Sequence, residues 1–228
     1  MIRAALLAIA LVAAPASAAQ IFPATYSMLN GQGDASCGGF GQCYNYWDKK
    51  YNGPGAPSTT DSALLTGGVG DLTDGTIAST TYSGTEGYGG DGPYVGWYQG
   101  FTANPIVTFN FAGTATLDTI RIHLDNSFQG GVQAPAAILI NGNSYSFTAP
   151  AAGTAGFVDF TGLNLVGDTH TVQFVQENGR WVFVSEVEFL GSLAGGVPEP
   201  SQWALMLGGF GLLGAAMRRR RQTAGMFA

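Results

Sequence analysis

Two glutamates near the C-terminal end are the first residues that could do chemistry. Glu186 and Glu188 stand two positions apart in an alternating segment, so they share one strand face, and glycoside hydrolysis requires paired carboxylates. Carboxylates on a strand face are more often solvated or bound to a metal. The sequence holds no Gly-x-Ser-x-Gly motif, no His-Glu-x-x-His motif and no cysteine placed for activation. We therefore expect a protein without catalytic residues that is not an enzyme.

A second group of residues could bind a ligand through their rings. Aromatic side chains lie in Gly-rich segments, where a ring can stack on a sugar while a nearby Asp or Asn holds its hydroxyls. The candidates are Tyr44, Tyr46, Trp47, Tyr88 and Tyr94, with Tyr98 beside them. The alternative is that such rings only cover the core, and this is the expectation for Trp97 and Trp181.

The N-terminal residues predict a signal peptide over 1–19. Met1-Ile2-Arg3 gives a positive start, residues 4–14 are all apolar, and Ala16-Ser17-Ala18 has the small-x-small pattern that signal peptidase cuts. Cleavage is expected after Ala18 or Ala19. The apolar run is too short to cross about 30 Å of hydrocarbon as a helix. We therefore expect export across the inner membrane of a Gram-negative-type bacterium, with signal peptidase as a partner.

The C-terminal segment 194–228 has the pattern of a short transmembrane helix. Pro198-Glu199-Pro200 precedes an apolar run, expected as a helix over about 202–217, and four arginines follow at 218–221. The run is shorter than the roughly 20 residues of a comfortable span, so it would be a weak permanent anchor. The positive charges place the C-terminus in the cytoplasm and the body in the periplasm, as the signal peptide also requires.

These C-terminal residues resemble the PEP-CTERM sorting signal, a tag for exosortase-type transpeptidases. The resemblance rests on the order of the motif, which consists of Pro198, Glu199 and Pro200, then Trp203-Ala204-Leu205-Met206, Gly208-Gly209-Phe210-Gly211, and Arg218, Arg219, Arg220 and Arg221. It implies an exosortase-type sorting enzyme as partner and cleavage near the Pro-Glu-Pro triplet. The protein is then membrane-anchored only transiently, before it reaches the cell surface or the extracellular space.

The body between the two ends, about 20–193, has the length of one domain and is acidic. The whole chain carries a net charge of −6, and removal of five arginines and Glu199 with the two ends leaves −10. Such a surface repels phosphate backbones, which argues against nucleic acid as a partner. Carboxylates on an exported, Gly-rich body suit calcium, which prefers oxygen ligands.

Two cysteines, Cys37 and Cys43, lie in a Gly-rich loop of this body. In the oxidising environment that follows export, we expect them to form a local disulfide. A zinc site is the alternative, but no histidine or third cysteine lies nearby, and the Cys-x-x-Cys spacing is absent.

The body is expected to be β-structure because its apolar residues recur with period two and never sustain a helical period. Segments 104–111 and 117–124 alternate in this way, which places Arg121 and His123 outward. Strands are also expected at 24–28 and at 76–82, within a loop-rich N-terminal part.

Turn residues predict two hairpins in the second half of the body. Asn141-Gly142-Asn143 separates segments 137–140 and 145–148, and Glu177-Asn178-Gly179-Arg180 separates 170–176 and 181–190. Short strands separated by Gly, Pro, Asn and Asp predict an antiparallel β-sandwich.

A longer resemblance runs over about 60–190. Leu72-Thr73-Asp74-Gly75, followed by 93–97, 107–111, 120–123 and 181–189, resembles a galactose-binding-like domain, the superfamily of discoidin modules and several carbohydrate-binding modules. The resemblance implies an all-β, eight-stranded jelly-roll β-sandwich. It also implies a structural calcium between the Asp-Gly loop and a glutamate of the last strand, here Asp74 and Glu186, with Asp71 as a weaker candidate. The alternative is that Asp74-Gly75 only forms a turn and that Glu186 simply faces outward.

Together these features favour an exported surface or matrix protein whose body is a carbohydrate-binding or adhesive module, with an extracellular polysaccharide as partner. The alternative is a non-catalytic structural protein of a biofilm or exopolysaccharide matrix, and a glycoside-active enzyme ranks last.

Overall fold

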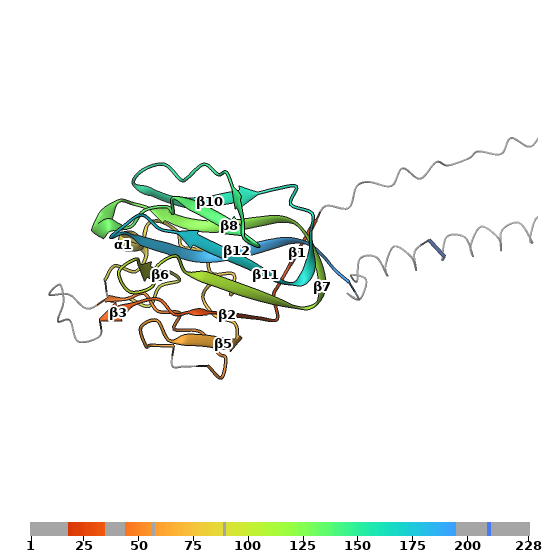
Figure 1. Ribbon diagram of the computed structural model, residues 1–228, viewed down its shortest axis with the longest axis horizontal. Coiled ribbons are helices and arrows are strands. Elements are labelled where there is room, and N and C mark those ends of the chain that lie inside the picture. The colour runs from red at the N-terminus through yellow and green to blue at the C-terminus, as the bar shows by residue number, and fades with distance from the viewer. Residues whose placement is uncertain (1–17, 35–43, 56–57, 89, 195–208, 211–228) are drawn as a thin grey trace, which may run out of the picture. The chain divides into compact units, whose positions relative to one another are not determined.

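The computed structural model describes residues 18–34, 44–55, 58–88, 90–194 and 209–210 (Figure 1). The chain divides into two compact units, Met1–Ala194 and Gly195–Ala228, and all the strands belong to the first. The elements in chain order are β1 (Ala19–Ile21), β2 (Thr25–Leu29), β3 (Gly33–Asp34), β4 (Tyr44–Asn45), β5 (Leu64–Gly68), α1 (Tyr82–Thr85), β6 (Val95–Tyr98), β7 (Ile106–Asn126), η1 (Gln129–Gly131), β8 (Ala137–Ile140), β9 (Asn143–Tyr145), β10 (Thr154–Phe160), β11 (Leu165–Val175) and β12 (Trp181–Leu193). The predicted β-structure is confirmed.

The long strand β7 takes part in both layers of a β-sandwich (Figure 1). Its first half pairs with β2 on one edge and β11 on the other, and β11 continues to β8 and β9. Its second half pairs with β10 and β12, and β12 also pairs with β1 and β6. All these pairs are antiparallel. Because β7 belongs to both layers, the layers form one continuous sheet of ten strands, while β3 and β4 form a separate pair.

The core lies where side chains of the two layers meet. Phe109, in the first half of β7, contacts Phe189 of β12 with ring centres 4.8 Å apart, and Trp97 of β6 stacks on Phe174 of β11 at 5.9 Å. These four rings are almost completely buried. Truncation of one such ring to alanine would lower the free energy of unfolding by about 3–5 kcal/mol. These two ring contacts therefore hold the layers together.

The first predicted hairpin is confirmed, whereas the second is wrong. β8 and β9 pair across Asn141 and Gly142, whose φ angles of 49° and 78° suit the tight turn that an Asn-Gly pair favours. The turn 177–180 also reverses the chain, but β11 and β12 do not pair with each other. Each pairs instead with β7, on opposite layers. The turn residues therefore determine that the chain reverses direction, but they do not determine which strand each flanking strand pairs with.

Three further expectations differ from the structure. Segment 76–82 is not a strand and leads into the short helix α1. The described residues form twelve strands rather than eight, because the N-terminal part adds β2 to β5. His123 is buried rather than exposed, since Tyr94 and Phe157 pack against its ring.

Candidate functional site

A cavity of about 410 Å³ lies where β12 begins. It is surrounded by segments that are far apart in the sequence, namely β4, the region of α1, the turn η1 and the first residues of β12. Six of its eight lining residues are aromatic. The lining consists of Tyr44, Tyr46, Tyr82, Tyr88, Gly130, Val132, Trp181 and Phe183.

Strand β12 supplies one wall and part of the floor. Trp181 and Phe183 are two positions apart, so both side chains point to the same face of the strand. Phe183 is buried and Trp181 is half-buried, with ring centres 5.6 Å apart. Gly96 of β6 lies opposite Phe183, where a Cβ would come within 2.4 Å of the Phe183 ring. A larger residue at position 96 would therefore displace the floor of the cavity.

Tyr44 and Tyr46 supply the adjoining wall. The Gly96 N–H donates to the Tyr46 carbonyl at 2.9 Å, which fixes this segment along β6. The Tyr44 ring stacks on Tyr46 at 5.9 Å and meets Trp181 edge-on at 5.8 Å. The Tyr46 hydroxyl donates to the Gly87 carbonyl at 3.1 Å, so the wall is tied to the loop that carries Tyr88.

The region of α1 completes the cavity. Asp125 accepts hydrogen bonds from the Tyr82 and Ser127 N–H groups, both at 2.6 Å, and so links the start of α1 to the end of β7. Tyr82 is buried, whereas Tyr88 is 50% exposed at the rim. This arrangement keeps buried rings at the bottom and an accessible ring at the opening.

The phenol groups of Tyr46 and Tyr82 remain protonated at physiological pH. Burial, reinforced by Tyr82 and Glu86, raises the pKa of Tyr46 far above its ordinary value. Burial, reinforced by Tyr88, raises the pKa of Tyr82 to about 12. No charged side chain is among the described residues that line the cavity. The cavity therefore offers ring faces and neutral hydroxyls, which suit a ligand with apolar CH faces and hydroxyl groups.

The structure brings three of the five candidate aromatic residues to this cavity, Tyr44, Tyr46 and Tyr88. Trp47 and Tyr94 lie outside its lining and are buried. The Trp47 indole N–H donates to Asp61 at 2.7 Å, and the Tyr94 hydroxyl donates to the Thr80 carbonyl at 2.7 Å.

Sequence reasoning missed Tyr82, Trp181 and Phe183. Trp97 is in the core as expected, but Trp181 lines the cavity. The signal for Trp181 was its position at the first residue of a strand directly after a Gly-containing turn, where a strand is open to solvent.

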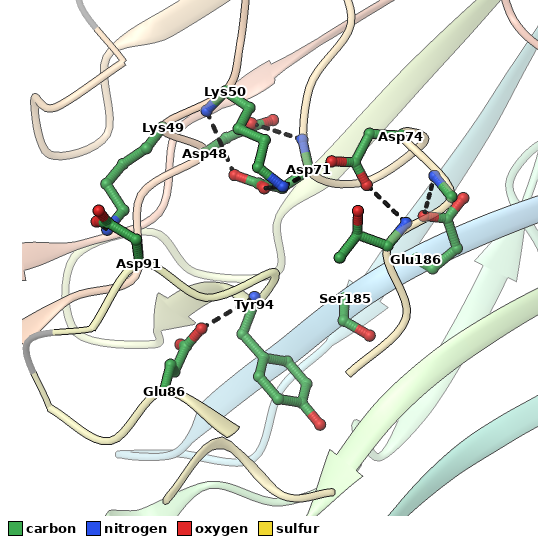
Figure 2. A network of polar contacts seen from close by, with 12 residues as sticks. Asp48, Lys49, Lys50, Asp71, Asp74, Glu86, Asp91, Tyr94, Ser185 and Glu186 are labelled. Carbon is green, nitrogen blue, oxygen red and sulfur yellow. Dashed lines mark hydrogen bonds and ion pairs between the residues drawn. The ribbon is translucent and has the colours of Figure 1, made fainter. Parts of the chain in front are cut away.

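A second polar region joins the Asp74-Gly75 loop to strand β12 (Figure 2). The Gly75 N–H donates to Glu186 Oε2 at 3.0 Å, and the Val187 N–H donates to the Leu72 carbonyl at 2.8 Å. The expectation that this loop and the last strand meet is therefore confirmed.

Glu186 is buried, contrary to the alternative that it faces solvent. The loop covers it, and a β-bulge between Val184 and Glu186 shifts the register of β12 there. Burial, reinforced by nearby Asp74 and Glu188 and opposed by the Gly75 hydrogen bond, raises the pKa of Glu186 to about 8. Glu188 instead pairs with Arg121 at 2.7 Å, so the two glutamates have separate partners.

Lys50 supplies a positive charge to the same loop (Figure 2). Its Nζ donates to Asp74 Oδ2 at 2.8 Å and lies 3.3 Å from Asp71 Oδ1. Burial opposes ionisation of Asp74, but the interactions with Lys50 and the hydrogen bonds with Thr76 together outweigh it and lower the pKa of that carboxyl. Asp71 is almost completely buried, and burial raises its pKa even though Lys50 opposes the shift.

Asp48 extends this region toward the core. It accepts from the Asp71 N–H at 2.8 Å and from the Tyr26 hydroxyl. Burial raises the pKa of Asp48 to about 7, although both hydrogen bonds oppose the shift. The region therefore joins Asp74 and Asp71, which pair with Lys50, to buried Asp48.

Asp74 and Glu186 have the oxygen donors expected for calcium, but Lys50 competes for one of them. Both residues have carboxyl oxygens at the same loop, the kind of ligand that calcium prefers. Lys50 already satisfies one oxygen of Asp74. Two carboxylates supply at most four of the roughly six to eight oxygens that calcium takes, so carbonyl or water oxygens would have to complete a site. Among the described residues, no three His, Cys, Asp or Glu side chains cluster closely enough to hold a metal.

Several expected features lie outside the described residues. These are the signal peptide up to residue 17, the pairing of Cys37 with Cys43, the sorting triplet Pro198-Glu199-Pro200 and the four arginines at 218–221. Within the described ranges, no helix is both long and apolar enough to cross a membrane.

Comparisons with known proteins give two family matches. The DS-like domain of discoidin domain-containing receptors 1 and 2 matches residues 24–191, well over half of the chain. The PEP-CTERM protein-sorting motif matches residues 196–221. No curated protein matches the chain.

The chain is also similar to several solved structures. One is reported for a β-galactosidase of Streptococcus pneumoniae, with 13% identity over 54% of this chain and 84% of that chain and a TM-score of 0.39. Another is a fucose-binding module of the same organism, with 12% identity, coverages of 56% and 100% and a TM-score of 0.32. A third is a fucolectin from striped bass (Morone saxatilis) serum, with 14% identity, coverages of 75% and 79% and a TM-score of 0.34.

The chain belongs to the discoidin family through a DS-like domain over residues 24–191, and it carries a PEP-CTERM sorting motif after that domain.

Proposed function

We propose that the body is a carbohydrate-binding domain that works outside the cell, and that the aromatic cavity holds the sugar. The observation that carries this proposal is the composition of the cavity, six aromatic side chains around about 410 Å³. That volume falls within the usual range of small-ligand pockets, roughly 300–1,000 Å³. A sugar ring presents CH groups to an aromatic face and hydroxyls to phenol groups, so it matches both features of this lining.

The charge of the protein supports a neutral sugar over an acidic one. The body carries a net charge of −10, and Glu86 and Asp125 lie close enough to the cavity tyrosines to raise their pKa values. No lysine or arginine is among the lining residues that the structure describes. A uronic acid or a sialic acid would therefore approach an acidic surface without a cation to receive it.

A glycan array with the mature protein tests the proposal. Tyr88→Ala removes a half-exposed ring at the rim, so the fold should tolerate it, and the affinity for the bound glycan should fall about threefold to tenfold. Phe22→Ala is the matched control, because Phe22 is 60% exposed and does not line the cavity.

Two outcomes would argue against this function. If wild-type protein binds no glycan, the proposal fails and a structural role in the matrix is favoured. Turnover of chromogenic glycosides would instead indicate an enzyme, which we do not expect.

The sorting motif supports a route to the cell surface. Signal peptidase removes the first residues, and the C-terminal segment anchors the protein in the inner membrane with its arginines in the cytoplasm. An exosortase-type enzyme then cuts near Pro198-Glu199-Pro200. The intact mass of the exported protein should lack both ends, and a surface form that still contains Arg218 to Arg221 would contradict this route.

Calcium bound between the Asp74-Gly75 loop and Glu186 would stabilise the domain rather than contact the sugar. The contact between the Gly75 N–H and the Glu186 carboxyl, which brings the Asp74-Gly75 loop to the last strand, supports this proposal. A chelator should then lower the melting temperature of the wild-type protein, because an ion that binds only the folded state adds to its stability.

A further inference from the structure

The aromatic surface does not end at the cavity. Trp181 contacts Tyr44, which lines the cavity, and also Tyr98, with ring centres 5.8 Å and 5.2 Å from its own. Tyr98 is the cross-strand partner of Trp181 and lies outside the cavity lining. The Tyr98 ring in turn lies 6.0 Å from that of Phe101, whose side chain is 66% exposed. A continuous series of rings therefore leads out of the cavity.

A tight turn holds Phe101 in this position. The N–H groups of Phe101 and Thr102 both donate to the Tyr98 carbonyl at 3.0 Å. Thr102 is buried, and its hydroxyl accepts a hydrogen bond from Gln32 at 2.8 Å. The exposure of Phe101 is therefore a property of an ordered turn.

The same turn is tied to the residues that precede Trp181. The Gln99 N–H donates to the Arg180 carbonyl at 3.0 Å, and the Gln99 side chain accepts from the Gly179 N–H at 3.1 Å. The turn that carries Phe101 is thus bonded to the two residues directly before Trp181, which holds Phe101 near the start of β12.

We infer that the ligand is a saccharide chain, which occupies the cavity with one sugar and continues past Trp181 onto a second subsite at Tyr98 and Phe101. The inference rests on the proposed function. Tyr98 links the two rings, with its ring centre 5.2 Å from that of Trp181 and 6.0 Å from that of Phe101, so the centres of Trp181 and Phe101 lie at most about 11 Å apart. A free monosaccharide fills only the cavity, whereas a longer chain also covers the exposed face of Phe101. The preferred ligand is therefore a polysaccharide segment rather than a single terminal sugar.

The test compares short and long chains of the same sugar. Calorimetric titration of the mature protein would use mono-, di-, tetra- and hexasaccharides of β-glucan, β-mannan and β-galactan as probes. In the series that binds, affinity should rise from the monosaccharide to the tetrasaccharide. Phe101→Ala should lower the affinity for the longer chains about threefold to tenfold and leave the monosaccharide unchanged. Tyr88→Ala should weaken every member of the series equally, and Phe22→Ala should weaken none.

The outcomes separate this inference from the function on which it rests. If the wild type binds none of the probes and no glycan on the array, the proposed function itself fails. If it binds a monosaccharide and longer chains equally well, the cavity is a sugar site and the second subsite is refuted. The inference is also overturned if Phe101→Ala retains the full chain-length effect. If that variant instead converts a dimer to a monomer in sedimentation, the surface is an interface between two copies of the protein.

Discussion

Replacement of Glu186 by glutamine should make the domain less sensitive to pH. Glu186 is 1% exposed, and its pKa is raised to about 8, so the folded protein holds a proton that the unfolded chain releases above its ordinary pKa of 4.5. Glutamine has the shape of the protonated glutamate and keeps an oxygen that can accept the hydrogen bond from Gly75. It carries no charge at any pH.

The sign of the effect follows from proton linkage. Because the folded state binds the proton more tightly, the contribution of Glu186 is complete below about pH 4.5 and is lost as the pH rises toward 8. Each pH unit in this window removes about 1.4 kcal/mol, which sums to about 5 kcal/mol between the two plateaus. Wild type and Glu186→Gln should therefore have similar stability at pH 4.5. At pH 8.5 the variant should melt about 10 °C or more above the wild type.

Thermal unfolding at both pH values, in the presence of a chelator, provides the measurement. Other buried acids, such as Glu86 and Asp48, titrate in both proteins and cancel in the comparison. Glu188→Gln is the control, because it only removes an ion pair with Arg121 that is worth about 0–1 kcal/mol and should not reproduce the gain. A Glu186→Gln variant that is less stable than wild type at pH 8.5 under these conditions would refute the reasoning.

The same measurements with calcium in place of the chelator test the metal proposal. If calcium binds at Glu186, it should raise the melting temperature of the wild type at pH 8.5 and leave that of Glu186→Gln unchanged. If both proteins ignore calcium, Lys50 is the cation that balances this loop, and the metal proposal fails.

Three further predictions concern other parts of the chain. Signal peptidase should cut after Ala18, because this preserves all of β1, and N-terminal sequencing of the exported protein would show whether residue 19 is retained. Cys37 and Cys43 should resist alkylation in unreduced protein, and labelling of both, seen by mass, would exclude the disulfide. Lys50→Met should lower the unfolding free energy by about 1–2 kcal/mol in chemical denaturation, because it leaves buried Asp71 without its cation, and unchanged stability would contradict this.

Much of the sandwich could be predicted from the sequence because its strands alternate clearly. Val107, Phe109 and Phe111 face the core as expected, as do Ile120 and Leu124. The sequence could not show that segments 104–111 and 117–124 form a single strand, since the intervening residues carry only small polar and apolar side chains. That continuity depends on pairing with four other strands, which is a property of the whole fold.

The candidate site was predictable only in part, because exposure depends on what covers a residue. Tyr44 and Tyr88 stood out through their loop-rich surroundings, and the structure places both at the cavity. Trp181 did not, because strand periodicity does not reveal that the start of β12 lies uncovered. The burial of Glu186 could not be predicted either, because the loop that covers it lies more than a hundred residues earlier in the chain.

Strand β12 connects the aromatic cavity to the C-terminal end of the domain. The strand starts at Trp181, at the cavity, and ends at Leu193, shortly before the sorting motif that begins at residue 196. Thirteen residues of strand span about 40 Å at about 3.3 Å per residue, less a small shortening at the bulges. The cavity therefore lies about 40 Å along the strand from the residue at which the chain leaves the domain.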